Sequence, residues 1–468
     1  MTIPDQAHAN DAVPTRHPTG GDVIPLPQAT RTWFVISLQT FGGPAGQIAV
    51  MQHKLVDEKR WIGQQRFLHA LNYCMLLPGP EAQQLAIYTG WLLNGTLGGL
   101  IAGTLFVLPG VVALLVLSAV YVAFGDSTTV TALFAGLAPA VIAIVVQAVY
   151  RVGKRSLTHP ALVALAVASF LALALFGVPF PLVVFAAGLF GWLLARRVPG
   201  LTRRTSDQTG DGPAPLISDE ALHHDLPPKR RLLTITVGGL ALWLTPVAAA
   251  ALVATVSGTH VFVEQGLFFS GTALVTFGGA YAVLAYVAQQ AVNVYHWLVP
   301  GEMVRGLALA ETTPGPLIMV VQFVAFIGAY HDPGNLDPWL AAVLASLLVT
   351  WVTFVPCFLL VFLGAPYVER LRSNHHLTAA LTGITAAVVG VIANLALFFA
   401  LHNLFAGTHL ISAGPLHLQL PALATWKPAE FALTAVALLA MFWRGWSTLL
   451  TLGLCAVLGL LIGAVGLT

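Results

Sequence analysis

The 468-residue chain is 57% hydrophobic and only 9% charged, and its mean hydropathy is +0.82. Because a soluble protein carries about 25% charged residues, this composition excludes an ordinary soluble globular protein and predicts an all-α polytopic membrane protein. The net charge of +2 gives no indication of nucleic-acid binding.

The first part of the chain predicts a disordered tail followed by one membrane unit. Residues 1–30 are polar, contain prolines and lack the apolar core of a cleavable signal peptide. Residues 31–195 form the first unit, whose apolar stretches are long enough to cross or enter a bilayer. Its six hydrophobic segments are 33–50, 68–92, 96–123, 132–150, 160–177 and 179–195.

The second part repeats this organisation after a linker and one extra segment. Residues 196–231 are rich in Arg, Asp, Pro and Gly, which predicts a solvated cytoplasmic linker. Residues 232–256 form an apolar segment without a counterpart in the first unit. The second unit, 262–468, brings the expected total to 13 segments with 264–290, 299–329, 338–363, 378–403, 429–443 and 446–467.

Two glycine-containing motifs recur at one fixed spacing. Thr-Phe-Gly-Gly occurs at 40–43 and again at 276–279, and Pro-Gly-Pro occurs at 78–80 and again at 314–316. Both pairs are 236 residues apart. Helix breakers inside duplicated apolar sequence are typical of secondary transporters, which bind substrate where their helices are interrupted.

The repeat extends beyond these motifs. Trp61 and Trp297 share the spacing of 236, and beyond an inserted loop at 330–338 the spacing becomes 247, which aligns Gln147 with Asn394. Seven predicted segments precede the second copy, so it enters the membrane from the opposite side. The sequence therefore predicts an inverted repeat with discontinuous or re-entrant helices.

The distribution of Lys and Arg in the loops places the N-terminus in the cytoplasm. The basic stretch from Lys54 to Arg66 disagrees, because it falls outside if segment 33–50 crosses the membrane completely. If 33–50 and 68–92 are re-entrant, the stretch moves inside and the later topology is unchanged. Both arrangements stay open, and the stretch is predicted to form a solvated amphipathic face at the membrane surface.

The first motif interrupts a helix with Gly42, Gly43 and Pro44, because proline lacks an N–H group and clashes with the preceding turn. Unpaired backbone groups in hydrocarbon cost several kcal/mol, so the break must line a cavity or pack within protein. A half-helix that begins near Pro44 presents N–H groups and a positive dipole end to an anion. In the second copy the break depends on Gly278 and Gly279 alone. The alternative is a small-residue patch that lets helices pack closely.

The second motif, Pro-Gly-Pro, cannot continue a helix in either copy. Glu81 follows the first occurrence directly, and Glu311 precedes the second by three residues. A carboxyl group at membrane depth is a functional candidate by default, here for proton coupling. The alternative is that each acid caps N–H groups at the start of the following helix.

The predicted substrate pathway consists of the break residues and the amides near them. Amide side chains donate to an oxyanion without titrating, although each also suits a hydrogen bond between helices. Arg66 and Arg305, near the start of each Pro-Gly-Pro segment, are candidate entrance charges, with snorkelling to the interface as the alternative. The pathway residues are Thr40, Gly42, Gly43, Pro44, Gln47, Pro78, Gly79, Pro80, Gln84, Gln147, Thr276, Gly278, Gly279, Thr312, Thr313, Pro314, Gly315, Pro316 and Asn394.

The sequence contains no catalytic, cofactor or metal-binding motif. It has no Walker A, Rossmann glycine, HExxH or G-x-S-x-G pattern, which argues against an ATP-driven pump and against an enzyme. Cys74, Cys357 and Cys455 lie in apolar segments without metal-ligand spacing, so they are predicted to be small buried side chains.

These motifs resemble those of the chromate ion transporter (CHR) family, long-chain type. The resemblance covers about residues 30–195 and 262–405, and Ala280 departs from it where many second copies carry a third glycine. It implies efflux of chromate from the cytoplasm across a bacterial inner membrane, with resistance to chromate as the result and the isosteric dianion sulfate as competitor. The matching stretches are T-F-G-G-P-A-G-Q at 40–47, the amphipathic stretch ending at Trp61, L-L-P-G-P-E-A at 76–82, T-F-G-G-A-Y-A-V at 276–283 and T-T-P-G-P at 312–316.

The electrostatics of a dianion agree with export. A dianion that leaves a cell with a negative interior gains about 4.6 kcal/mol at a potential of 100 mV. Because a carboxylate repels a dianion, Glu81 or Glu311 is expected either to be protonated when substrate binds, which couples transport to protons, or to face away.

The alternatives are a permease for sulfate, another oxyanion or a small organic anion, and a non-transport membrane scaffold. The expected partners are the oxyanion and the lipid bilayer, and a homodimer stays open.

Overall fold

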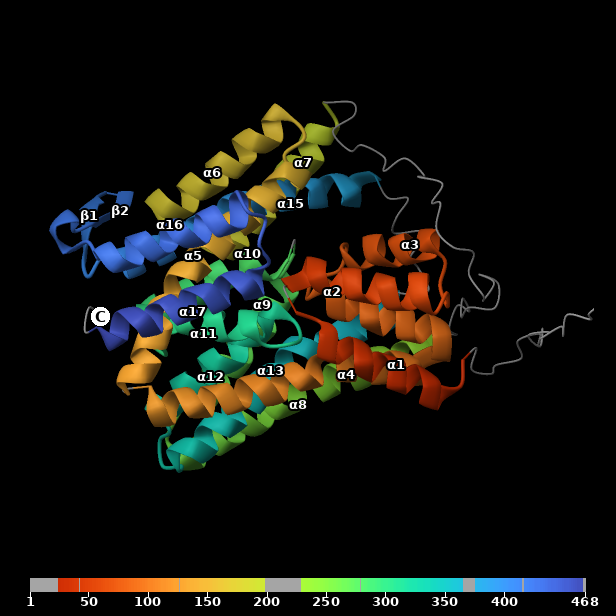
Figure 1. The fold of residues 1–468 in the computed structure, drawn as a ribbon. Helices are drawn as coiled ribbons and strands as arrows, with labels where there is room; N and C mark the ends of the chain where they lie inside the picture. Colours follow the sequence, from red (N-terminus) through yellow and green to blue (C-terminus); the bar gives the residue numbers. More distant parts are fainter. Residues whose placement is uncertain are drawn as a thin grey trace, which may run out of the picture.

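The chain folds into a bundle of helices with one two-stranded sheet (Figure 1). The predicted tail up to residue 23, most of the predicted linker, Gly42 and Gly278 lie outside the residues that the structure describes. The computed structural model describes residues 24–41, 43–125, 127–197, 229–277, 279–364, 375–414 and 416–465.

The predicted class, an all-α polytopic membrane protein, is confirmed by the length and apolarity of the helices. Within the described residues, five helices are long and apolar enough to cross a bilayer, and several shorter apolar helices accompany them. Large apolar side chains such as Phe185 and Leu252, each 72% exposed, cover the outer surface of the bundle. In water such a surface would aggregate, whereas hydrocarbon solvates it.

The first copy contains seven α-helices and a π-helical turn within the described residues. Segments 33–50 and 68–92 are each interrupted at the predicted motif. The elements are α1 (Leu26–Gln39), α2 (Gly43–Gln52), a π-helical turn (His53–Glu58), α3 (Gln64–Cys74), α4 (Glu81–Phe124), α5 (Thr128–Ser156), α6 (Pro160–Phe176) and α7 (Phe180–Ala195).

Helix α4 is a helical hairpin rather than one straight rod. Asn94 and Gly95 leave the helical conformation, and Gly95 has φ of +60° with ψ of −153°, a combination open essentially to glycine. A Cβ atom on Gly103 would lie only 2.4 Å from the Ile87 side chain. In a continuous helix these residues would be about 24 Å apart. The chain therefore folds back at the boundary between the predicted segments 68–92 and 96–123.

The second copy repeats this order behind α8 (Lys229–Ser257). The loop at 332–337 replaces the tight turn of α4, which confirms the predicted insertion. The elements are α9 (Val261–Val275), α10 (Ala280–Gln289), a π-helical turn (Gln290–Val294), α11 (Pro300–Thr312), a 3-10 turn (Leu317–Met319), α12 (Val320–His331), α13 (Pro338–Gly364), α15 (His375–Leu404), β1 (Thr408–Ala413), β2 (Leu416–Pro421), a 3-10 turn (Leu423–Thr425), α16 (Pro428–Phe442) and α17 (Thr448–Ala464).

The β1–β2 hairpin is an element that the sequence analysis did not predict. Its strands pair antiparallel, with Thr408 opposite Pro421 and Ala413 opposite Leu416. Alternation of polar and apolar residues on both sides of Gly414 was the available signal, because this pattern is typical of a hairpin.

The two copies share unusual backbone conformations as well as sequence. Among the described residues, only Arg60 and His296 have positive φ without being glycine, with values of 53° and 54°. They are 236 residues apart, each follows a π-helical turn, and each precedes one of the matched buried tryptophans Trp61 and Trp297. A non-glycine residue in this region is strained, so its recurrence shows that the copies keep the same local structure.

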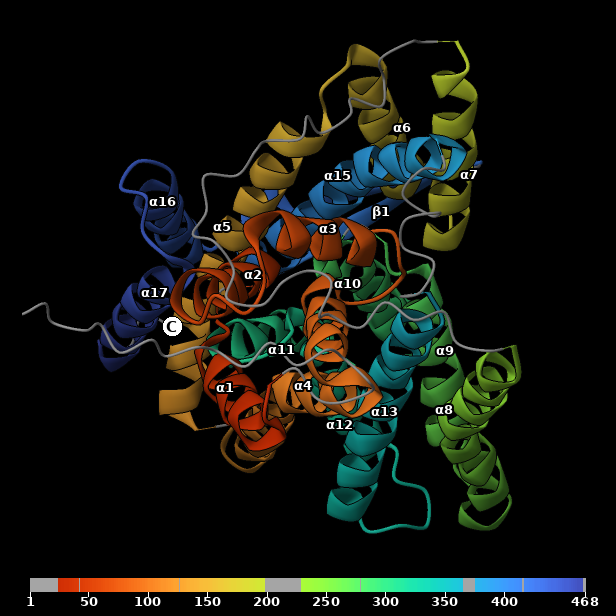
Figure 2. The same ribbon diagram turned by 90° about the vertical axis from the view of Figure 1, so that its right-hand side faces the viewer.

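The outer helices are exchanged between the copies. Helix α15 of the second copy packs against α6 and α7 of the first, and α5 of the first copy packs against α16 and α17 of the second (Figure 2). Glycines allow these contacts: a Cβ atom on Gly136 would lie 2.9 Å from Cα of Gly459, and one on Gly191 would lie 2.8 Å from Cα of Gly383. Small residues at such crossings let the backbones approach closely.

This exchange predicts matched losses of stability at the two crossings. We expect Gly136→Ala and Gly383→Ala each to lower the unfolding temperature of the detergent-purified protein, because the new methyl group would lie 2.1 Å from the Cys455 carbonyl oxygen and 2.4 Å from that of Ala187. Overpacking of this kind costs about 1–3 kcal/mol. Gly453→Ala on α17 is the control, since it meets no atom within 4 Å. Equal unfolding temperatures for all three variants would contradict the exchange.

Candidate functional site

The four helix breaks bind one another across the two copies. The N–H group of Gly79 donates to the carbonyl oxygen of Thr276 at 2.8 Å, and the N–H group of Gly315 donates to that of Thr40 at 3.0 Å. The second bond is the first with its copies exchanged, because both pairs of residues are related by the spacing of 236. The Thr-Phe-Gly-Gly break of each copy is therefore joined to the Pro-Gly-Pro break of the other.

Glycine is required at the centre of both Pro-Gly-Pro breaks. Gly79 has φ of +122° and Gly315 has φ of +107°, values that other residues rarely adopt. A Cβ atom on Gly79 would lie 2.9 Å from Sγ of Cys357 on α13, and one on Gly315 would lie 3.4 Å from Cα of Gly110 on α4. Cys357 and Gly110 are themselves related by the spacing of 247. The breaks thus pack symmetrically against the long helices.

The predicted pathway amides at the breaks bind backbone carbonyl groups. Gln84 Nε2 donates to the Pro78 carbonyl oxygen at 2.6 Å, and Gln47 Nε2 donates to the Gly315 carbonyl oxygen. These side chains hold the breaks in shape. Gln147 on α5 accepts a hydrogen bond from Arg151, and Asn394 is half-buried at the matched position of α15.

The threonine hydroxyl groups at the breaks bond within their own helices. Each donates to a carbonyl oxygen three or four residues earlier, between 2.6 and 3.0 Å away. They therefore satisfy carbonyl groups at the ends of the helices that precede the breaks. The four are Thr40, Thr276, Thr312 and Thr313.

Helix starts surround the joined breaks. Helix α4 begins after Pro80, α10 begins after Gly279, and the 3-10 turn that leads into α12 begins after Pro316, and no side chain caps any of these starts. Helix α2 begins at Gly43, with Pro44 in its first turn. The 3-10 turn packs against α10, and the bond from Gly79 to Thr276 places the start of α4 near the break that precedes α10. Their N–H groups and dipoles make the centre electropositive.

The two acidic residues are both at this centre, but their surroundings differ. Glu311 is 3% exposed, and the Tyr281 hydroxyl group, from the start of α10, donates to its Oε1 at 2.5 Å. Glu81 opens α4 and is half-buried, near Cys74. It is the acidic residue in the first turn of this helix.

Sequence reasoning missed two contributors to the site. Tyr281 lies two residues after Gly279, inside the Ala-Tyr-Ala extension of the second motif, which was the signal available for it. The arginines at the end of α5 were counted only as loop charges, yet the charge of Arg151 acts on Glu311 and that of Arg155 acts on Glu81. Their spacing of four residues within an apolar helix was the signal in this case.

The predicted entrance charges lie apart from the joined breaks. Arg305 Nη1 donates to the Tyr121 hydroxyl group at 3.0 Å, near the far end of α4, and its guanidinium group lies over the Phe134 ring. Arg66 is half-buried on α3. Glu302, the matched position of Arg66, caps its own helix by accepting from the Val299 N–H group at 3.0 Å.

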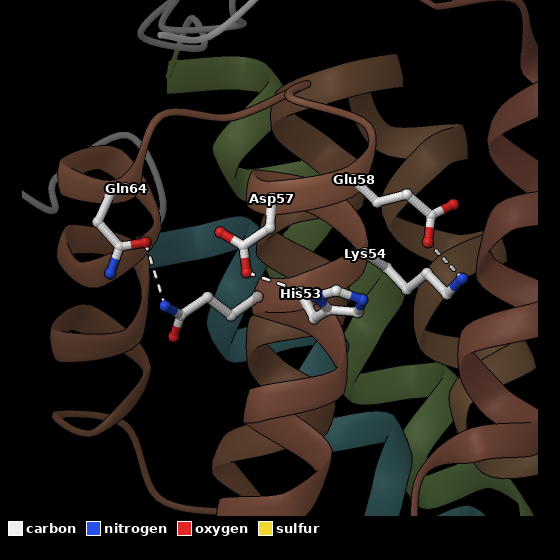
Figure 3. A network of polar contacts seen from close by, with 6 residues as sticks. His53, Lys54, Asp57, Glu58 and Gln64 are labelled. Atoms are coloured by element: carbon white, nitrogen blue, oxygen red, sulfur yellow. Dashed lines mark hydrogen bonds and ion pairs between the residues drawn. The ribbon is translucent and has the colours of Figure 1, made fainter. Parts of the chain in front are cut away.

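The basic stretch after α2 forms a polar network (Figure 3). Lys54 Nζ lies 2.5 Å from Glu58 Oε2, and His53 Nδ1 lies 3.6 Å from Asp57 Oδ2. The hydrogen bond from Lys54 lowers the pKa of the exposed Glu58 carboxyl group. Leu55, between them in sequence, is fully buried, so this turn has the amphipathic character that the sequence predicts.

Comparison with known proteins gives one consistent family. The sequence profile of the family described as Chromate transporter matches residues 28–192 and 263–460. A chromate transport protein of Pseudomonas aeruginosa is 31% identical over 76% of this chain and 77% of its own length. A chromate transport protein of Cupriavidus metallidurans is 28% identical over 74% of this chain and 75% of its own length. No solved structure matches the chain.

The bond between Tyr281 and Glu311 predicts an order of stability. Tyr281→Phe is expected to lower the unfolding temperature, because it leaves a buried carboxyl group without its donor, a loss of about 1.5–3 kcal/mol. Glu311→Gln keeps an acceptor for the hydroxyl group and removes an ionisable group from the interior, so its unfolding temperature should equal or exceed that of the wild type. Thermal unfolding in detergent measures both, and the reverse order would refute this role for the pair.

Proposed function

Because this chain belongs to the chromate transporter family, we propose that it is a secondary transporter that exports chromate from the cytoplasm across the bacterial inner membrane. Two relatives of similar length carry the name chromate transport protein, which supports this substrate. The observation that carries the proposal is the reciprocal bonding of the breaks through Gly79 and Gly315, with uncapped helix starts around them.

The electropositive centre suits a tetrahedral dianion. Each helix start contributes a partial positive charge of about half an elementary charge, together with N–H groups that no side chain caps. Sulfate has the same shape and charge as chromate, so it should compete for this centre. Pocket shape and hydrogen bonding alone discriminate weakly between isosteric anions.

The membrane potential favours the export of a dianion, and the two acids are the groups through which protons would be coupled to it. A dianion gains about 4.6 kcal/mol on leaving a cell with an interior 100 mV negative. Glu81 and Glu311 would repel it while ionised. We infer that each binds a proton when the oxyanion occupies the centre and releases it afterwards, which couples the movement of chromate to that of protons.

In many transporters, alternating access depends on two copies of opposite orientation. Figure 1 supports this arrangement, because α1, α2 and α3 of the first copy lie at one end of the bundle, whereas α11 and α12 of the second lie at the other. The same view supports re-entrant helices for segments 33–50 and 68–92. With the N-terminus in the cytoplasm, the network at Lys54 then faces the cytoplasm as well.

Flux measurements in proteoliposomes test the substrate and the direction. We expect chromate to move down an imposed potential, toward the positive side, and sulfate in excess to slow it by competition. A permease for another anion would show faster flux of sulfate, molybdate or phosphate than of chromate. A membrane scaffold would show no anion flux and no thermal shift with any of these anions, and that result would refute the proposal.

Proton coupling is tested by removing both acids. With Glu81→Gln and Glu311→Gln combined, we expect chromate flux that no longer responds to an imposed pH gradient, because neutral amides neither repel the dianion nor carry a proton. In the wild type, flux should fall as pH rises, since ionised carboxylates oppose binding. Glu264→Gln, an exposed acid in the first turn of α9, is the control. Unchanged pH dependence in the double variant would disprove proton coupling through these acids.

A further inference from the structure

The last two turns of α5 carry a polar face, and one residue of it contacts the segment that precedes the first Pro-Gly-Pro break. Gln147, Arg151 and Arg155 follow one another at intervals of four residues, which places them on one side of the helix. Arg151 Nη2 donates to Gln147 Oε1 at 2.6 Å. Arg155 Nη2 lies 3.8 Å from Sδ of Met75, the residue at which α3 ends before the Pro-Gly-Pro break.

The two guanidinium groups lie within electrostatic range of the two acids. The charge of Arg155 acts on Glu81, and the charge of Arg151 acts on Glu311 and its partner Tyr281. Within the described part of the chain, neither arginine approaches either carboxylate within the 4.0 Å of an ion pair. Both arginine side chains are exposed. Their N–H groups that are not bonded within the protein are therefore accessible to a small solute.

We propose that Arg151 and Arg155 form the binding site that captures the oxyanion from the side on which α5 ends, before it reaches the breaks. This inference rests on the proposed function and names residues for its first step. Guanidinium groups bind tetrahedral and planar oxyanions through two parallel N–H groups, and they keep their charge at all physiological pH values. Two of them one turn apart can hold a doubly charged oxyanion between them.

The second copy lacks this site. The spacing of 247 aligns Arg151 with Phe398 and Arg155 with His402 on α15. The centroids of the Phe398 and His402 rings are 4.3 Å apart, and His402 Nδ1 lies 2.8 Å from the Phe398 carbonyl oxygen. These two residues therefore contact each other rather than presenting cations to a solute. The capture site therefore exists at one end of the pathway, and the two sides of the membrane should bind the oxyanion with different affinity.

Snorkelling of basic residues to the interface is the alternative for α5, and Lys154 separates the two explanations. Lys154 lies on the same turn, is exposed and carries the same charge, but it is outside the four-residue spacing of Gln147, Arg151 and Arg155. An effect of interfacial charge alone would be equal at all three positions. A capture site requires the arginines and tolerates loss of the lysine.

The test measures chromate transport by oriented vesicles with α5 facing the chromate. We expect Arg151→Gln and Arg155→Gln each to raise KM about tenfold or more, the loss typical of a charge-assisted hydrogen bond, with less change in kcat. KM should also depend less on ionic strength in these variants, because the screened charge is gone. Lys154→Gln should keep the KM of the wild type. Unfolding temperatures confirm that each variant is folded.

A gain of function gives a second, independent readout. His402→Arg introduces one cation at the matched end of the second copy, and we expect a lower KM when chromate is presented from that side. If both arginine variants transport with the KM of Lys154→Gln, the capture site is refuted while the proposed function stands. If an arginine variant fails to fold, the His402→Arg result decides, and an unchanged KM overturns the proposal. Absence of oxyanion flux in the wild type refutes the proposed function instead.

Discussion

Backbone groups inside a bilayer have no water to bind, and this constraint organises the centre of the molecule. Interrupting four helices leaves N–H and C=O groups without partners in their own segments. The N–H groups of Gly79 and Gly315 find acceptors in the opposite copy, where they donate to the carbonyl oxygens of Thr276 and Thr40. Neither copy can complete its own breaks, so the interrupted helices are stable only when both copies are present.

The same reciprocity appears at the periphery. Helix α5 packs against α17 through Gly136 and Gly459, and α15 packs against α7 through Gly383 and Gly191. Each copy thus surrounds helices of the other as well as binding its breaks. Any movement of one copy against the other changes contacts at the centre and at the periphery together, which is how a small change at a central site can reach both ends of a bundle.

The class, the breaks and the repeat were predictable because they depend on local chemistry. Glycine and proline restrict the backbone wherever they occur, and a fixed spacing of 236 needs no structure to be recognised. The roles of polar side chains were less accessible. Gln47 and Gln84 suit an oxyanion as well as a carbonyl group, and only the structure shows that carbonyl groups occupy them. The face of α5 was visible in the sequence, but what it faces was not.

A symmetric scaffold alone has no preferred direction, so a vectorial function must reside where the copies differ. At the breaks, Leu317 stands at the position that matches Glu81, and Met75 at the one that matches Glu311. Neither acid is therefore repeated, although the bonds that join the breaks are. In the proposed mechanism the shared backbone forms the centre for the anion, and the unmatched side chains supply its protons and its entrance.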